Sequence, residues 1–112
     1  QKMTCKVTQW QPSAKVQDEY KRKLVTADEA VKVVKSGDYL HYGLFTGVVV
    51  DLDRALAKRA DELEDVTICA TMWSYAEPPE VLKADPKAEH FHYSSSHFTP
   101  IERKCNKEGN YS

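Results

Sequence analysis

Three short strand-like segments alternate with helix-like segments along this chain, and this order restricts the fold more than any other feature of the sequence. The expected strands cover residues 38–42, 66–70 and 89–94, with helical patterns between them and after the last one. Strand–helix–strand units close with right-handed crossovers into parallel pairs. We therefore expect an α/β fold with an open, mostly parallel sheet and helices on both faces.

Local start and stop signals define the expected helices. A first, mostly charged helix covers residues 13–23. A second begins at a capping box formed by Thr26 and Glu29 and closes at Gly37 in the left-handed conformation. A third has Asp51 as its N-cap. Its buried face carries four apolar residues at helical spacing: Leu52, Leu56, Ala60 and Leu63.

The last two helices begin at prolines. A short one opens at residues 78–79 and runs through Leu82, where residues 85–86 break it. The final helix starts at Thr99, has Pro100 at its first position and Glu102 three residues after the cap, and ends at Gly109. The nearly continuous apolar run of residues 66–70 lies between the third helix and the first of these two. Such a run is typical of a strand buried on both faces, in which Cys69 packs as a small apolar side chain.

Composition excludes several classes of protein. The 112 residues include 16 Lys and Arg and 17 Asp and Glu, for a net charge of −1, so we expect no nucleic-acid partner. No apolar run approaches the roughly 20 residues that cross a bilayer, so we expect no membrane partner. The three cysteines are odd in number and contain no CxxC pair, which argues against a zinc site or a disulfide framework and favours a cytoplasmic setting.

Candidate site residues follow the expected strands. Ligands of open α/β sheets bind beyond the carboxyl ends of the strands, which places residues 43–47, 71–76 and 94–97 on one rim. Gly43 and Gly47 flank a turn that is either an ordinary tight turn or a ligand loop, and it has neither a dinucleotide nor a P-loop pattern. Trp73 and Tyr75 either cap the core or line a pocket, and both alternatives stay open here.

The segment HFHYSSSH offers a weak metal-site pattern. His90 and His92 share one face of a strand, and His97 is a conceivable third ligand. The alternative is that the intervening aromatic residues face the core while the histidines face solvent. Because no further Cys or second His pair completes a ligand set, we expect no metal. The serines beside His97 have no Asp placed to complete a hydrolase triad.

Both ends of the sequence suggest a piece of a larger domain. The chain begins at Gln1, and residues 109–112 read as the junction between a helix and a further strand. We expect residues 1–11 to form a flexible tail and residues 12–112 to form the N-terminal portion of a truncated domain. A domain cut here exposes an apolar face, so we also expect a homo-oligomer.

Three stretches together resemble the acetyl-CoA hydrolase/transferase family. DEYKRKLVTADEAVKVVKSGDYLHYG, residues 18–43, is similar to the charged helix, capped helix and glycine-ended strand that open its members. GLFTGVVVDLDRALAKRADELEDVTI resembles the glycine loop, helix and strand that follow. HFHYSSSHFTPIERK, residues 90–104, is similar to a region of butyryl-CoA:acetate CoA-transferases. The resemblance covers about residues 18–112 and respects every element boundary given above.

The resemblance implies an enzyme that moves coenzyme A from a short-chain acyl-CoA to a carboxylate such as acetate. In the family a glutamate attacks the thioester and becomes a glutamyl-CoA intermediate, and no Glu of this chain matches it. The chain alone is then inactive, with the remainder of the polypeptide as its partner, no bound cofactor and a coenzyme A thioester as substrate. Residues implied to line the acyl and carboxylate pocket are Gly43, Thr46, Gly47, Val48, Ser96 and His97.

One position departs from the family pattern. Relatives often have proline two residues after the second glycine, where this chain has Val49. The run of three valines then makes the loop more apolar, which favours a less polar acyl group. Two alternative functions stay open: a sheet of the sugar-phosphate isomerase kind whose glycine turn holds a phosphate, and a non-catalytic binding subunit.

Overall fold

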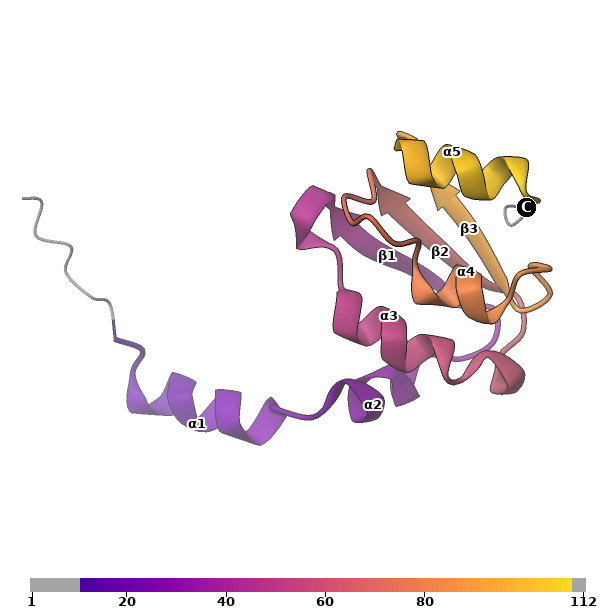
Figure 1. Ribbon diagram of the computed structural model, residues 1–112. Coiled ribbons are helices and arrows are strands. Elements are labelled where there is room, and N and C mark those ends of the chain that lie inside the picture. The colour runs from indigo at the N-terminus through magenta and orange to yellow at the C-terminus, as the bar shows by residue number, and fades with distance from the viewer. Residues whose placement is uncertain (1–10, 110–112) are drawn as a thin grey trace, which may run out of the picture.

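The computed structural model describes residues 11–109, and its elements follow the expected order (Figure 1). Most of the predicted tail lies outside these residues, as does the predicted strand start beyond Gly109. The helices and strands are α1 (Ala14–Lys23), α2 (Ala27–Ala30), β1 (Tyr39–Leu44), α3 (Val50–Ala57), β2 (Val66–Thr71), α4 (Glu80–Ala84), β3 (Phe91–Ser95) and α5 (Pro100–Lys107). Short 3₁₀ turns cover Val31–Val33, Phe45–Gly47 and Ala60–Glu62.

The three strands form one parallel sheet in the order β1-β2-β3. Ile68 in the middle of β2 lies opposite Leu40 of β1 and Tyr93 of β3, so the strands are closely in register. This arrangement confirms the predicted open, parallel sheet. Each crossover carries a helix, α3 between β1 and β2 and α4 between β2 and β3.

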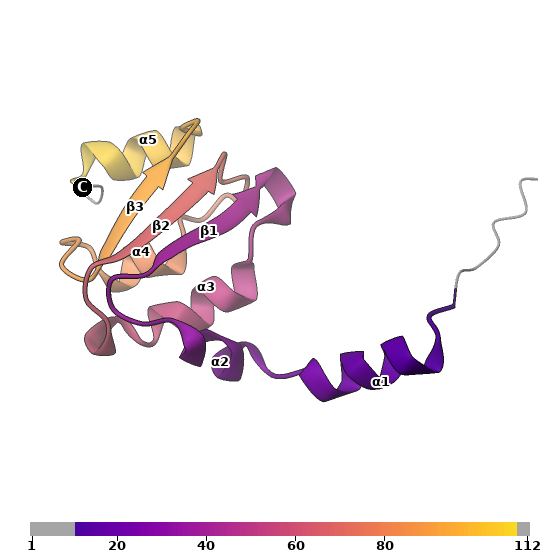
Figure 2. The same ribbon diagram turned by 180° about the vertical axis from the view of Figure 1, so that it is seen from behind.

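The helices that pack on the sheet cover one face of it, where we expected them on both. Helices α3, α4 and α5 lie in front of the strands in Figure 1 and behind them in Figure 2. The strand order explains the positions of α3 and α4, because successive right-handed crossovers that step in one direction place their helices on the same side. The prediction that residues 66–70 are buried on both faces is wrong: exposure alternates along β2, and Cys69 is half-buried on the open face.

The core lies between this sheet and its helices. Phe91 and Tyr93 of β3 point into it, as do Val66, Ile68 and Ala70 of β2. The helices contribute Ala55, Leu56, Val81, Leu82 and Cys105, and the neighbouring turns contribute Val31, Ala60 and Leu63. Apolar residues at period two on the strands therefore meet apolar residues at helical spacing, as the sequence pattern requires.

Helix α1 stands apart from this body (Figure 1). Ser13 caps it, its hydroxyl accepting from the backbone N–H of Val16. None of its residues is buried, and the side chains of Val16 and Tyr20 are each more than half exposed. Within the described part of the chain, no helix is long and apolar enough to cross a membrane.

Four predicted helix ends can be compared with the structure in detail. The Thr26 hydroxyl accepts from the Glu29 N–H at 3.2 Å, but the Glu29 carboxylate pairs with Lys32 at 2.7 Å. The helix then tightens into a 3₁₀ turn and stops before Gly37, whose φ of +83° is left-handed as predicted. Helix α3 begins at Val50, so Asp51 lies inside the first turn and is not its cap. The capping box predicted at the start of α5 is present in full.

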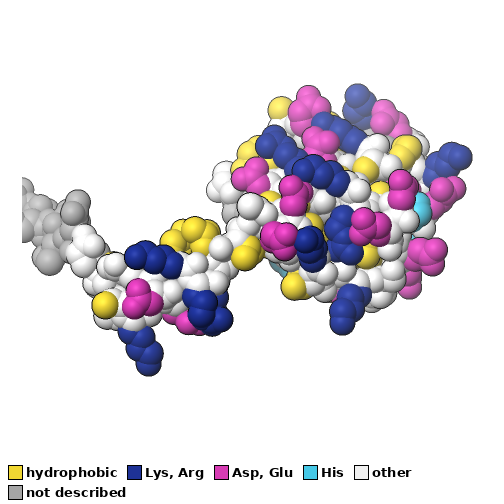
Figure 3. All heavy atoms as spheres, turned by 90° about the horizontal axis from the view of Figure 1, so that it is seen from below, with side chains coloured by type: hydrophobic (Ala, Val, Ile, Leu, Met, Phe, Trp, Pro, Cys, Tyr) yellow, Lys and Arg dark blue, Asp and Glu magenta, His cyan; other side chains and the backbone are white. Residues whose placement is uncertain are grey.

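Charges of both signs are interspersed over the face seen from below in Figure 3. Several charged side chains of the protein form ion pairs, among them Lys58 with Asp28 at 2.9 Å and Arg59 with Glu62 at 2.9 Å. Arg59 also donates to the backbone carbonyls of Val31 and Val34, which fixes the turn after α2 against the end of α3. Exposed pairs of this kind contribute about 1 kcal/mol or less each, so the fold rests on its core.

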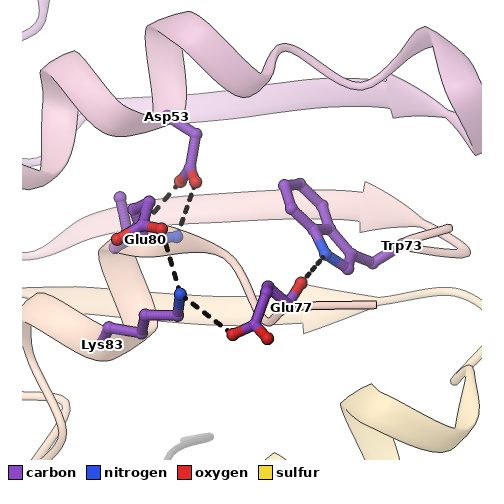
Figure 4. A network of polar contacts seen from close by, with 6 residues as sticks. Asp53, Trp73, Glu77, Glu80 and Lys83 are labelled. Atoms are coloured by element: carbon purple, nitrogen blue, oxygen red, sulfur yellow. Dashed lines mark hydrogen bonds and ion pairs between the residues drawn. The ribbon is translucent and has the colours of Figure 1, made fainter. Parts of the chain in front are cut away.

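A buried carboxylate on α3 ties three elements together. Asp53 is 1% exposed and accepts from the Tyr42 hydroxyl of β1 at 3.1 Å. Its other contacts are the backbone N–H groups of Glu80 at 2.6 Å and Val81 at 3.4 Å (Figure 4). Pro79 occupies the N-cap position of α4 and has no side-chain acceptor. The Asp53 carboxylate therefore accepts the hydrogen bonds that an N-cap side chain would normally accept. Burial raises the pKa of Asp53, and that of the Tyr42 phenol is raised as well.

A second carboxylate fixes the entry to β3. Asp85 is 4% exposed and accepts from the backbone N–H groups of Glu89, His90 and Phe91 at 3.0, 2.7 and 2.8 Å. Burial by itself raises the pKa of Asp85, but the donated hydrogen bonds outweigh it and hold the pKa below its usual range. The chain that leaves α4 is thus turned directly into the third strand.

Removal of the Asp53 carboxylate should destabilise the protein more than removal of one of its donors. Asp53→Ala leaves a buried hydroxyl and two N–H groups unpaired, so we expect a loss of about 3–5 kcal/mol in unfolding free energy. Tyr42→Phe removes only one hydrogen bond to a charged group, with an expected loss of about 1.5–3 kcal/mol. Urea unfolding measures both, and equal losses would contradict the bracing role of Asp53.

The contribution of the Asp85 carboxylate to the free energy of unfolding should depend on pH. We expect Asp85→Asn to lose about 2 kcal/mol at neutral pH. Because the folded-state pKa lies below the unfolded value of about 4, this contribution is present above about pH 4 and is lost as the pH falls through the folded-state pKa. The difference between the wild-type and variant unfolding midpoints should therefore narrow on acidification. The exposed Asp61→Asn serves as the matched control, and a difference that stays constant with pH would argue against the proposed linkage.

Candidate functional site

The three strands end together at one rim of the sheet. Leu44 at the end of β1 lies beside Thr71 at the end of β2. The hydroxyl oxygen of Thr71 is 2.9 Å from that of Ser96, which directly follows β3. The backbone N–H of Ser96 also donates to the Ala70 carbonyl at 3.3 Å. Residues 43–47, 71–76 and 94–97 therefore share a rim, as the sequence predicts.

Gly43 is required by the conformation of the first rim loop. Its φ is +92°, and a Cβ placed on it would lie 2.9 Å from the carbonyl oxygen of Gly47. The β1–β2 register is broken between His41 and Leu44, and the Gly43 N–H donates to the Nδ1 atom of His41. Bulged strand ends of this kind are over-represented next to active sites, where they redirect the chain. Glycine here allows the loop to fold closely back on itself.

The rest of this loop is divided between solvent and core. Thr46 and Gly47 are exposed, and a Cβ on Gly47 would meet no atom within 4 Å. Val48 is 7% exposed and belongs to the core, and Val49 packs against the core as well. The valine run is therefore turned toward the helix–sheet core. Substrate contact by Gly43, Thr46, Gly47 and Val48 stays a prediction.

Two residues on the rim hold strained backbone conformations. Phe45 directly follows β1 with φ of 52°, and Met72 directly follows β2 with φ of 56°. A left-handed residue other than Gly, Asn or Asp is unfavourable by about 1–3 kcal/mol, and such residues cluster at functional sites. Two of them at the ends of neighbouring strands mark the rim as the candidate site.

The third rim segment carries exposed polar side chains. Ser96 and His97 are both exposed, and the His97 carbonyl accepts from the Ser95 hydroxyl at 3.1 Å. These two predicted site residues therefore lie on the same rim as the glycine loop. The hydrogen bond between the Ser96 and Thr71 hydroxyls links this segment to the end of β2. Contact between them and a substrate stays a prediction too.

Trp73 both caps the core and lines a hollow, so the two alternatives left open by the sequence are both realised. Its side chain is 3% exposed, and its Nε1 donates to the Glu77 carbonyl at 2.7 Å. Tyr75 is 43% exposed and packs on Trp73 at a tilt, with ring centroids 5.6 Å apart. Together with the first turn of α5 they border a hollow of about 640 Å³. Sequence reasoning could find the aromatic pair but not the helix that faces it.

Ion pairs hold the loop that carries this aromatic pair (Figure 4). Lys83 of α4 lies 3.3 Å from the carboxylate of Glu77 and 3.1 Å from that of Glu80. Its hydrogen bond to Glu80 raises the pKa of the Lys83 ammonium. Because Asp53 fixes the start of α4 and Lys83 reaches back to Glu77, the end of this loop is held from two sides.

The histidines of HFHYSSSH have separate partners. His90 Nδ1 lies 2.8 Å from the Leu63 carbonyl, and His92 Nε2 lies 3.0 Å from the carboxylate of Asp65. Among the described residues, one cluster has metal-ligand chemistry, formed by Asp85, Glu89 and His90. The Asp85 carboxylate there already accepts three backbone N–H groups, which explains it as a structural brace.

Comparison with known proteins identifies the family. Residues 6–112 match the model of the acetyl-CoA hydrolase/transferase N-terminal domain. The chain is 51% identical over 94 residues to a butyryl-CoA:acetate CoA-transferase of Anaerostipes caccae, covering 82% of this chain and 20% of that protein. It is 48% identical over 90 residues to a probable butyrate:acetyl-CoA coenzyme A-transferase of Syntrophomonas wolfei, covering 80% and 20%. The chain thus spans about one fifth of the length of these relatives.

The fold has counterparts among solved structures. RipA from Yersinia pestis superimposes with a TM-score of 0.67 at 24% identity, over 87% of this chain and 24% of RipA. This likeness concerns the fold and agrees with the parallel sheet and helices described above. From the family match over nearly all of its residues, the chain belongs to the acetyl-CoA hydrolase/transferase family, as part of its N-terminal domain.

Proposed function

We propose that the whole protein containing this chain is a CoA-transferase that moves coenzyme A between a short-chain acyl-CoA and a carboxylate such as acetate. The observation that carries the proposal is the 51% identity over 94 residues to a butyryl-CoA:acetate CoA-transferase. A coenzyme A thioester is then a substrate, and the reaction needs no resident cofactor. The proposal concerns the whole protein, because the chain matches only 20% of that relative.

The reaction passes through a glutamate that lies outside residues 1–112. Its carboxylate attacks the thioester carbonyl and releases the coenzyme A thiolate, which leaves an acyl-glutamyl anhydride. The thiolate then attacks the glutamyl carbonyl, so that the acyl group departs as a free carboxylate and glutamyl-CoA remains. The incoming carboxylate reverses these two steps and leaves as the new acyl-CoA. Covalent catalysis of this kind divides one difficult exchange into easier steps.

This chain supplies one wall of the substrate site in that proposal. The rim combines the exposed hydroxyls of Thr46 and Ser96 with the tight loop at Gly43. Hydrogen-bond donors arranged in advance of reaction are what anionic intermediates of acyl transfer require. Support comes from the strained conformations of Phe45 and Met72, which persist only where the surrounding structure holds the rim in a fixed shape. The chain by itself is then inactive, and its assembly into a homo-oligomer and its cytoplasmic setting stay predictions.

Trapping of the intermediate tests the proposal. The full-length protein is incubated with butyryl-CoA and then with borohydride, which reduces a glutamyl thioester to the alcohol. We expect inactivation and a mass change on one glutamate outside residues 1–112. Borohydride without butyryl-CoA is the control. Full activity after treatment, or a modified glutamate within this chain, would contradict the mechanism.

Alanine substitutions test the glycine loop, because its two glycines differ in geometry. Gly43→Ala combines a left-handed φ with a 2.9 Å contact to the Gly47 carbonyl, so the loop must shift. We expect kcat/KM for butyryl-CoA to fall by at least about tenfold, since a small misplacement of binding groups is enough for such a loss. Gly47→Ala meets neither obstacle and should reduce kcat/KM much less. Equal effects of the two substitutions would contradict the importance given to the conformation of Gly43.

A further inference from the structure

The imidazole of His41 holds the backbone at the break in β1. The β1–β2 register shifts between His41 and Leu44, and Gly43 lies within this break. The Gly43 N–H donates to the Nδ1 atom of His41 at 3.0 Å. A side chain that accepts from the N–H two residues ahead closes a small turn, which Asn and Asp side chains form readily. His41 thus supplies a side-chain turn at the point where the chain enters the glycine loop.

This contact requires one protonation state of the ring. A backbone N–H can only donate, so Nδ1 must present its lone pair, and the proton of the neutral ring is then on Nε2. In an imidazolium both ring nitrogens are donors. Protonation of His41 therefore places two N–H groups against each other, and the turn at Gly43 loses its acceptor.

The groups that surround His41 offer it no ion pair within the described part of the chain. Its register partner on β2 is Cys69, and the titratable neighbours on β1 itself are Tyr39 and Tyr42. His41 also borders a hollow that it shares with α3 and the turn Val31–Val33, and the other residues that line this hollow are uncharged. None of these groups would compensate for the hydrogen bond that protonation removes.

The turn lies at the base of the glycine loop, where the backbone tolerates little change. Gly43 has φ of +92°, and a Cβ on it would lie 2.9 Å from the Gly47 carbonyl oxygen. On the core side, Asp53 holds the buried phenol of Tyr42 at 3.1 Å. His41 is exposed, so its hydrogen bond is the part of this arrangement that protons from solvent reach.

We propose that His41 is a positioning residue for CoA transfer, whose neutral imidazole holds the Gly43 N–H and thereby sets the shape of the glycine loop. The inference rests on the proposed function, because the loop affects the reaction only if the whole protein transfers coenzyme A. His41 acts through the backbone and not by contact with the substrate. Protonation of the imidazole then lowers activity in acid.

Two substitutions separate the acceptor atom from the imidazole ring. His41→Asn keeps an acceptor oxygen at the place of Nδ1 and does not titrate, whereas His41→Leu keeps a branched side chain and removes the acceptor. The assay measures kcat/KM of the full-length protein for butyryl-CoA with acetate as the acceptor. At about pH 8 we expect His41→Asn to stay near the wild-type value. His41→Leu should be roughly fivefold lower, as expected for the loss of one hydrogen bond.

The pH dependence tests the role of the neutral ring. The same assay is run between about pH 8 and pH 5, the range in which histidine side chains change charge. The ratio of wild-type to His41→Asn kcat/KM should fall about fivefold on acidification, because only the wild type loses its acceptor. Other titrating groups act on both proteins and cancel in this ratio. His92→Leu, near the start of β3 and away from the rim, is the matched control and should keep the wild-type profile.

The outcomes separate this inference from the proposed function. Rescue by asparagine together with a ratio that falls in acid supports the positioning role. That role is overturned, with CoA transfer left standing, if His41→Leu keeps the full kcat/KM, if His41→Asn loses as much as His41→Leu, or if the ratio does not change with pH. Urea unfolding of each variant checks its stability. Should His41→Leu not fold, the ratio of wild type to His41→Asn decides alone. A wild-type protein that transfers coenzyme A to no carboxylate overturns both.

Discussion

The buried carboxylate of Asp53 is the contact on which the arrangement of this domain most depends. It joins β1, α3 and the start of α4 through one hydroxyl and two backbone N–H donors. A helix that begins at a proline has no side chain of its own to cap it, so α4 needs an acceptor from another element. The loop between β2 and α4 carries Trp73 and Tyr75, and the position of α4 decides where that loop ends. The candidate site is thus supported from the helix layer beneath it.

Topology explains why the two faces of the sheet differ. Strands added in the order β1-β2-β3 send each right-handed crossover to the same side, so α3 and α4 cover one face, and α5, which follows β3, packs on that face as well. The other face presents Thr67, Cys69 and His92, none of which is fully buried. Parallel sheets are usually covered on both faces, and a reversal of strand order is what brings helices to the second one.

Backbone strain and a close backbone contact occur together at this rim. Phe45 and Met72 hold left-handed conformations at the ends of neighbouring strands, and Gly43 permits a contact that no other residue could make. Such conformations persist only where the surrounding structure enforces them. Here the enforcement comes from the core beneath Val48 and from the hydrogen bond between Trp73 and Glu77. A preformed rim of this kind suits a reaction whose intermediates must be held without rearrangement.

The order of the elements, the capping box at Thr99 and the left-handed Gly37 could all be predicted from the amino-acid sequence, because these features depend on residues close together in the chain. The family was also recognisable from the order and spacing of its motifs. Folding in three dimensions was needed to show which face of the sheet the helices cover, where Val48 points, and that Trp73 meets the first turn of α5. These outcomes depend on the direction of each crossover and on contacts between distant segments. Local periodicity carries no information about either.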